Sequence, residues 1–264
     1  MGLFPDGNRP IFLSDLFPTF SAKRLIMSDA FPVAFSVNRD ATFPAADESF
    51  ITSWSGGKDA CFAFWLACQQ GGLPAALYTM LDEQGTHTGS HGLHKDIIEA
   101  QAKALGVPVL FRAVPRGSYE QHMKDVVAES HERFNTTSVV FGDIDLDAHK
   151  VWLDRVTDEA NITPRFPLWH YTRRQLLDDV LKTGFKTMIV SLKHEKMDEK
   201  YLGQIMTPEL ANEIETLGIC PTAEDGEFHS LVVDGPCFTA PLAVKKGEVR
   251  YDNRGHAIID IALA

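Results

Sequence analysis

The amino-acid sequence predicts an α/β fold, in which a doubly wound parallel sheet of five or six strands is followed by a small C-terminal α+β addition. Two observations lead to this prediction. From residue 51 onward, short apolar segments with strand character alternate with longer segments of helical periodicity. The alternation stops after about Lys196, where a helical stretch and a hairpin pattern follow.

The predicted strands of the regular part are short and apolar, and each helix between them has its own boundary signals. The helix after the first strand is apolar almost all round, so we expect it to be deeply packed. Gly106 ends the next helix, and the last one begins at Thr172 as N-cap and stops at Gly184. The expected strands are 51–54, 75–81, 107–114, 138–141 and 187–192, and the helices are 59–70, 93–105, 119–134, 148–160 and 172–184.

The two ends of the chain differ from this regular part. Residues 1–47 carry scattered Phe-Pro pairs without a sustained period, which predicts a flexible N-terminal extension. A second hypothesis is that translation of the protein starts at Met27. Residues 48–196 form the predicted α/β domain, and 197–264 form an addition expected to bind substrate. That addition has a helix at 209–217, a strand at 228–234 and a hairpin turn at 252–255.

Composition excludes several classes of protein. The 264 residues are 44% hydrophobic and 23% charged, which is typical of a globular domain with a substantial core. No apolar run approaches the roughly 20 residues of a transmembrane helix. The formal net charge of −11 argues against a large nucleic-acid surface. The four cysteines show no metal-type spacing, so we expect reduced thiols and a cytoplasmic protein. A homodimer is one option for its oligomeric state.

Ser55-Gly56-Gly57-Lys58-Asp59 lies between the first strand and the first helix. Two glycines let the backbone turn tightly and approach an anion without a Cβ in the way. The N–H groups of the turn and the helix dipole favour a phosphate there, and Lys58 adds a positive charge. The loop is shorter than the one that holds β- and γ-phosphates for γ-transfer. It therefore favours a pyrophosphate leaving group, with attack at the α-phosphorus of a nucleotide.

The segment resembles the PP-loop of the N-type ATP pyrophosphatases, and the whole region 51–238 is similar to the diphthine–ammonia ligase family. Further segments support this in the expected order: Ser90-His91-Gly92-Leu93, Phe141-Gly142-Asp143-Ile144, Pro167-Leu168-Trp169 and 224–236 with Glu224-Asp225-Gly226-Glu227-Phe228-His229-Ser230. The resemblance implies a Rossmann-like, HUP-type fold. Three places depart from the family pattern, all in the expected acceptor region. Ala223 stands where relatives usually have glycine, Gly203-Gln204 where an arginine commonly follows the glycine, and His149-Lys150 where the pair more usually contains arginine.

Each candidate site residue has a chemical reason. Lys58 is expected to neutralise pyrophosphate in the transition state, and Asp59 either caps the helix or binds Mg²⁺. Asp143, at a strand's carboxyl end, is a candidate for Mg²⁺ or nucleotide contact, against the alternative of a turn-forming aspartate. His91 is expected near the phosphates, and a zinc pair with His94 lacks an evident third ligand. The resemblance adds Gly142, Thr79 and Met80 to the ATP-binding set, with the backbone around Thr79 to Leu81 facing the adenine.

The C-terminal motif supplies the expected substrate-binding residues, namely Glu224, Gly226, Glu227 and His229. Glu227 and His229 alternate along a predicted strand, so both point to one face and could handle a proton, unless the strand edge is merely solvated. Lys58, Asp143 and Glu227 are the expected catalytic residues.

The resemblance implies carboxylate activation that uses ATP and Mg²⁺. A carboxylate on a small molecule or a protein attacks the α-phosphorus, pyrophosphate leaves, and ammonia or an amine displaces AMP to give an amide. In the diphthine reaction the acceptor is a histidine-derived side chain on a translation elongation factor. Two alternatives are tRNA thiolation by a related PP-loop protein, which usually needs a reactive cysteine pair and a basic surface, and a non-catalytic adenine-nucleotide-binding protein.

Overall fold

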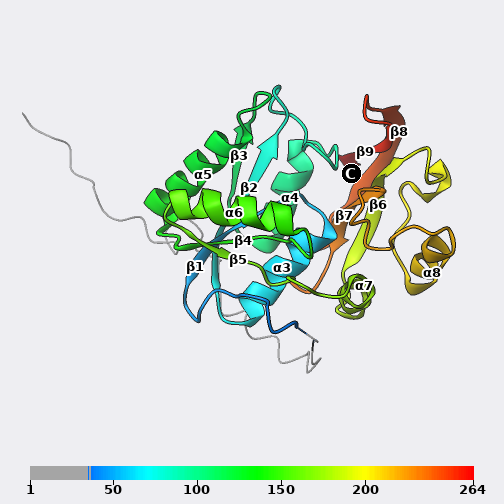
Figure 1. The fold of residues 1–264 in the computed structure, drawn as a ribbon. Coiled ribbons are helices and arrows are strands. Elements are labelled where there is room, and N and C mark those ends of the chain that lie inside the picture. The colour runs from blue at the N-terminus through cyan, green and yellow to red at the C-terminus, as the bar shows by residue number, and fades with distance from the viewer. Residues whose placement is uncertain (1–34, 36) are drawn as a thin grey trace, which may run out of the picture.

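The computed structural model of the protein describes residue 35 and residues 37–264. Two sheets lie side by side with helices between them and on their outer faces (Figure 1). Met27 and most of the predicted extension lie outside the described residues. No helix in the described part of the chain is both long and apolar enough to cross a membrane.

The first sheet is parallel and has five strands in the order β3-β2-β1-β4-β5. The order reverses between β1 and β4, and ligands of such sheets bind at the carboxyl ends of the strands at this switch. The five strands are β1 (Ser49–Ser53), β2 (Leu73–Leu81), β3 (Val109–Ala113), β4 (Ser138–Val140) and β5 (Thr163–Arg165).

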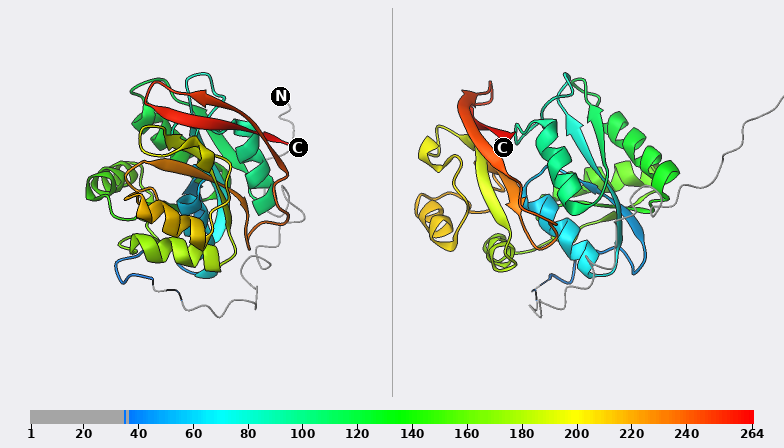
Figure 2. Two further views of the ribbon diagram at one scale, coloured as in Figure 1. Left: turned by 90° about the vertical axis from the view of Figure 1, so that its right-hand side faces the viewer. Right: turned by 180° about the vertical axis from the view of Figure 1, so that it is seen from behind.

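Helices cover both faces of this sheet, as predicted. Helices α5 (Tyr119–Phe134) and α6 (Asp147–Glu159) lie on the outer face, while α3 (Lys58–Gln69) and α4 (Lys95–Leu105) lie toward the second sheet (Figures 1 and 2). Ten of the twelve residues of α3 are buried. The helix is apolar all round because it packs between the two sheets.

The second sheet is antiparallel, in the order β7-β6-β9-β8. Its strands are β6 (Lys186–Lys193), β7 (Phe228–Asp234), β8 (Val244–Tyr251) and β9 (His256–Leu263), with the predicted hairpin turn between the last two. The helices α7 (Arg173–Lys182) and α8 (Pro208–Thr216) and the short 3-10 helix η1 (Glu199–Tyr201) accompany it.

Two strand predictions were wrong. Residues 187–192 were expected to be the last parallel strand, but they lie in β6, which pairs antiparallel with β7 and β9. β6 is antiparallel but buried along most of its length, as parallel strands usually are, so its apolar composition does not reveal strand direction. The prediction also missed β5, because Thr163-Pro164-Arg165 is an edge strand with no apolar run and with a proline that an edge tolerates.

The described segment 37–47 packs against the parallel-sheet part of the chain. Thr42 and Phe166 exchange two hydrogen bonds, with Thr42 N–H donating to the Phe166 carbonyl at 3.1 Å and Phe166 N–H donating to Thr42 Oγ1 at 2.8 Å. Phe35 contacts Phe62 and Trp65 edge-on. These contacts attach this stretch to β5 and α3.

Candidate functional site

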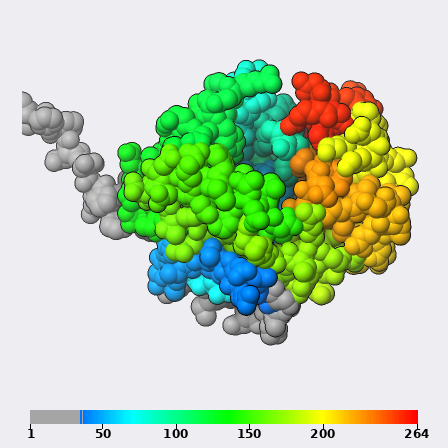
Figure 3. Space-filling model, in the orientation of Figure 1, coloured from blue at the N-terminus to red at the C-terminus, as the bar shows by residue number. Residues whose placement is uncertain are grey.

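A cavity of about 380 Å³ lies at the carboxyl ends of β1 and β2. Figure 3 shows the surface hollowed between the outer helices and the C-terminal strands. Four residues predicted to bind ATP line the cavity: Ser55, Thr79, Met80 and His91. Leu81, the end of the predicted adenine-facing stretch, lines it as well. The prediction missed the other lining residues, which are Ser53, Trp54, Tyr78, Asp82, Thr88, Gly89, Ser90, Val114 and Tyr119.

The glycine loop is packed tightly against β7 and the segment before α4. Gly56 has φ +86°, a conformation that favours glycine, and its carbonyl accepts the Val232 N–H at 3.0 Å. A Cβ on Gly57 would lie 2.5 Å from His91 Cε1 and 3.1 Å from the Ser230 carbonyl oxygen. Both glycines are therefore required by close neighbours in the protein itself.

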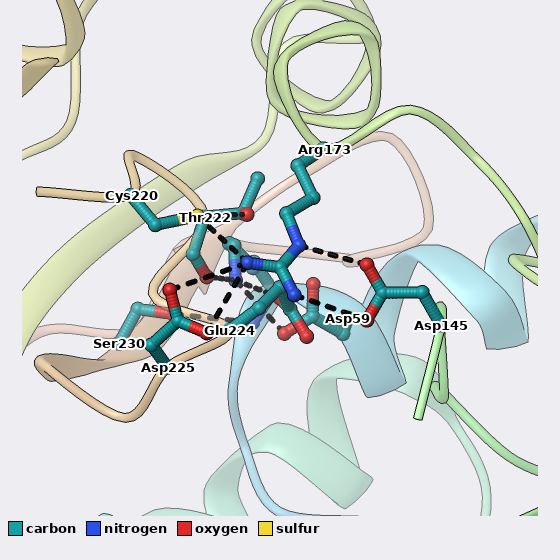
Figure 4. A network of polar contacts seen from close by, with 9 residues as sticks. Asp59, Asp145, Arg173, Cys220, Thr222, Glu224, Asp225 and Ser230 are labelled. Atoms are coloured by element: carbon teal, nitrogen blue, oxygen red, sulfur yellow. Dashed lines mark hydrogen bonds and ion pairs between the residues drawn. The ribbon is translucent and has the colours of Figure 1, made fainter. Parts of the chain in front are cut away.

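Lys58 is the buried cation of the site. Its side chain is 5% exposed, and Nζ donates to Asp59 Oδ2 at 2.9 Å and to the Thr222 carbonyl, with Glu224 Oε1 at 3.8 Å (Figure 4). Burial opposes the charged form, but Asp59 and Glu224 together raise the pKa of Lys58. The lysine is thus charged and held by acceptors from both parts of the chain.

Asp59 does not cap its helix. The N-cap residue of α3 is Gly57, and Asp59 is the second helical residue, paired with Lys58. Its other oxygen, Oδ1, is buried without a hydrogen-bond partner. Of the two predicted roles, capping is therefore wrong, and an oxygen remains available for a ligand.

Gly142 and Asp143 follow β4 beside the start of α3. A Cβ on Gly142 would lie 2.8 Å from the Ala60 nitrogen and 2.8 Å from the Asp59 carbonyl carbon. Asp143 forms an ion pair with His149, and this hydrogen bond raises the pKa of His149. Asp143 also raises the pKa of Tyr119, a residue that lines the cavity, in addition to the larger effect of burial.

Arg173 joins the parallel sheet to the acidic loop of residues 220–226. Its guanidinium donates to Asp145 through Nε at 2.8 Å and contacts Asp225 at 3.4 Å and Cys220 Sγ at 3.8 Å (Figure 4). The prediction missed this residue. An available signal was its place at the first position of α7, where the helix dipole disfavours a cation unless carboxylates hold it.

Glu224 lies at the centre of this network with a side chain that is 20% exposed. Burial and the neighbouring Asp59 raise its pKa to about 8, against the opposing effect of Lys58. The carboxyl group therefore changes charge close to neutral pH.

This pKa predicts a pH-dependent stability. A carboxyl group whose pKa is raised in the folded state binds its proton more tightly there, so stability falls as pH rises toward and through that pKa. We expect the free energy of unfolding to fall by roughly 1 kcal/mol more between pH 7 and 9 in the wild type than in Glu224→Gln. Urea unfolding of both proteins at the two pH values measures it. Equal losses of unfolding free energy in the two proteins would contradict the raised pKa of Glu224.

Histidines fill the contact between the cavity and the second sheet. His91 Nδ1 lies 2.8 Å from the Ser230 carbonyl oxygen, and the His91 and His229 ring centroids are 4.8 Å apart. Burial, followed by the neighbouring cations and histidines, lowers the pKa of His229 to about 2. Glu227 is 4% exposed with Oε2 unpartnered, so it is not on a solvated edge.

The structure does not form the zinc pair considered for His91 and His94. His94 instead caps α4 by accepting the Asp96 N–H, and its ring lies against His87. Among the described residues, no group of three or more His, Cys, Asp or Glu side chains is placed to hold a metal ion.

Comparisons with known proteins agree with this arrangement. The family model described as the diphthamide synthase N-terminal domain matches residues 49–164, and that of the diphthamide synthase C-terminal domain matches residues 172–263. A diphthine–ammonia ligase from Mus musculus is 24% identical over 222 residues, covering 74% of this chain and 82% of that protein. One from Schizosaccharomyces pombe is 22% identical over 217 residues, covering 74% of this chain but only 36% of that protein.

Among solved structures, a predicted subunit of a tRNA methyltransferase from Methanocaldococcus jannaschii aligns with a TM-score of 0.41 and 15% identity, covering 71% of this chain and 98% of that one. The two family models together span the glycine loop, the cavity and the acidic loop. The chain belongs to the diphthine–ammonia ligase family of PP-loop ATP pyrophosphatases.

Proposed function

We propose that this protein is an ATP-dependent ligase that converts a carboxylate into an amide, with release of AMP and pyrophosphate. The observation that carries the proposal is the position of Lys58, a buried cation at the start of α3, between the glycine loop and the acidic loop. A helix N-terminus with a lysine favours an anionic leaving group such as pyrophosphate.

The neighbouring cavity supports the nucleotide assignment. Its volume of about 380 Å³ is in the range of small-molecule sites, and the backbone of β2 from Thr79 to Leu81 forms one wall. We propose that adenosine occupies it while the glycine loop binds the β- and γ-phosphates. In this pose the α-phosphorus lies between the cavity and the acidic loop, where an acceptor carboxylate attacks it.

Mg²⁺ is part of the same proposal. Mg²⁺ in phosphate sites uses one or two carboxylates and completes its coordination with phosphate oxygens and water. The unpartnered Oδ1 of Asp59 fits this donor type, and Asp143 would supply a second carboxylate. When bound, the ion would neutralise charge on the departing pyrophosphate.

We assign the acceptor and amine to the C-terminal motif. Glu224, Gly226, Glu227 and His229 belong to or adjoin the acidic loop that meets Lys58. His229 is neutral at physiological pH, so it can accept a hydrogen bond from an amine, and Glu227 has a free oxygen. The names of the curated relatives make a protein-borne diphthine and ammonia the first substrates to test.

Incubation with ATP, Mg²⁺ and ammonium tests the proposal. We expect AMP and pyrophosphate to form in equal amounts only when a carboxylate acceptor is added, with one amide formed per AMP. Diphthine-bearing elongation factor is one acceptor arm, and a fractionated metabolite extract is the other, each followed by mass spectrometry. ATP binding without AMP formation in both arms would favour a non-catalytic nucleotide-binding protein.

The cysteines favour ligation over thiolation. Cys61, Cys68 and Cys237 are buried, and burial raises the pKa of the Cys61 and Cys68 thiols. Cys220, which contacts Arg173, is half-buried beside the site. A single thiol there is not the reactive pair that thiolation usually uses. All four cysteines are free, which supports a cytoplasmic location.

A further inference from the structure

The ammonium group of Lys58 is already surrounded by oxygen atoms of the protein. An ammonium group has three N–H donors. Nζ donates hydrogen bonds to the Thr222 carbonyl and to Asp59 Oδ2, and it forms an ion pair with Glu224 Oε1 at 3.8 Å, which is beyond hydrogen-bond distance. A phosphate that binds Nζ must therefore compete with two hydrogen bonds and one ion pair that the protein supplies.

The backbone donor of the same residue is also engaged. The Lys58 N–H donates to Ser230 Oγ at 3.3 Å, and Ser230 is 5% exposed. Acceptors from residues 222–230 thus occupy both groups of Lys58 that a pyrophosphate would bind. Figure 4 shows these side chains converging on the start of α3.

We propose that Glu224 and the acidic loop compete with the phosphates of ATP for Lys58, so that Glu224 sets the affinity for nucleotides that carry a pyrophosphate group. The proposal rests on the function proposed above, because it takes Lys58 as the phosphate ligand. Glu224 acts here through Lys58 and is a positioning residue.

The three acceptors differ in how readily they can leave. Asp59 follows Lys58 on the same helix and moves with it. Thr222 and Glu224 belong to the acidic loop, which contacts Arg173 through a 61% exposed Asp225 at 3.4 Å and through Cys220 Sγ at 3.8 Å. Loop movement would free Nζ from both of its loop partners at once. It would also remove the Glu224 charge, which would otherwise face the phosphates.

The charge on Glu224 makes the competition selective. Lys58 and Asp59 on α3, Asp145 after β4 and Arg173 on α7 are the charged groups that face this carboxyl group. ATP and pyrophosphate would need Lys58, whereas AMP has no β- or γ-phosphate to place there. A change at Glu224 should therefore alter the binding of ATP and pyrophosphate but leave AMP unaffected.

Calorimetric titration with ATP, pyrophosphate and AMP tests the proposal. The titrations are run at pH 9, because the pKa of Glu224 is about 8 and the carboxylate is then charged. We expect Glu224→Gln to bind ATP and pyrophosphate at least about tenfold more tightly than the wild type, with AMP affinity unchanged. Glu132→Gln is the matched control, since it makes the same substitution at an exposed position on α5, outside the acidic loop, and it should change ATP affinity less than twofold.

A second measurement needs no variant. Saturating pyrophosphate should speed amide hydrogen exchange in residues 219–226 of the wild-type protein, because the loop leaves Lys58. The absence of such a change, or equal ATP affinity in Glu224→Gln and wild type, would overturn the proposal. Weaker ATP binding by Glu224→Gln only when Mg²⁺ is present would make Glu224 a metal ligand instead. If the wild type binds neither ATP nor pyrophosphate, the proposed function itself fails.

Discussion

Replacing Lys58 with methionine is expected to lower AMP and pyrophosphate formation by about 1,000-fold. Lys58 is the charged donor at the start of α3, and its charge is needed most when negative charge builds up on the departing pyrophosphate. Methionine keeps the length of the side chain but has no charge and no N–H donors. Single-turnover assays of pyrophosphate release, with the acceptor identified as described above, measure the loss.

The fold should survive this substitution, although at some cost in stability. Removing Lys58 leaves Asp59 and Glu224 facing each other, and Glu224, whose pKa is already about 8, can take up a proton. The double variant Lys58→Met/Glu224→Gln should recover stability but not activity, which separates folding from chemistry. Wild-type turnover in a correctly folded Lys58→Met protein would refute the proposed role of Lys58 and the glycine loop in pyrophosphate release.

The local features of the chain could be read from the sequence because local patterns determine them. Helical periodicity located α5 and α6 to within a residue, and strand 228–234 matched β7. The glycine turn between the first strand and the first helix indicated Ser55, which lines the cavity. Thr79 and Met80, which the family resemblance implied, and His91 line the same cavity, since the carboxyl ends of parallel strands meet at one edge.

Contacts between distant segments could not be read in the same way. The partners of Lys58 are more than 160 residues away at Thr222 and Ser230, and no local pattern indicates them. The direction of β6 and the bridge from Arg173 to Asp145 and Asp225 depend on how the two sheets pack. The prediction therefore found the residue types of the site but missed how they neutralise one another.

Ala223 in the acidic loop has a strained backbone. It has φ +62°, a left-handed conformation that is strained for alanine. It precedes Glu224 directly in the chain. The strained residue therefore lies next to the carboxylate that pairs with Lys58.

Gly142 has the second large expected effect, because its nearest neighbours are backbone atoms. A Cβ there would meet the Ala60 nitrogen and the Asp59 carbonyl carbon, both at 2.8 Å, and backbone cannot turn away as a side-chain tip can. We expect Gly142→Ala to push the start of α3 away from β4, and with it Lys58 and Asp59. The free energy of unfolding should fall by about 2–3 kcal/mol, and ATP affinity should fall at least about tenfold.

Gly89→Ala is the matched control for stability. Gly89 has no neighbour within 4 Å of an added Cβ and no positive φ, so the same substitution there should change the free energy of unfolding by no more than about 0.5 kcal/mol. Urea unfolding of both variants compares a methyl group in open space with one against the helix start, and ATP titration compares Gly142→Ala with the wild type. If Gly142→Ala matched the wild type in both measurements, the close approach of β4 to α3 would not position the phosphate-binding residues. Gly142 would then require another explanation, such as direct contact with the nucleotide.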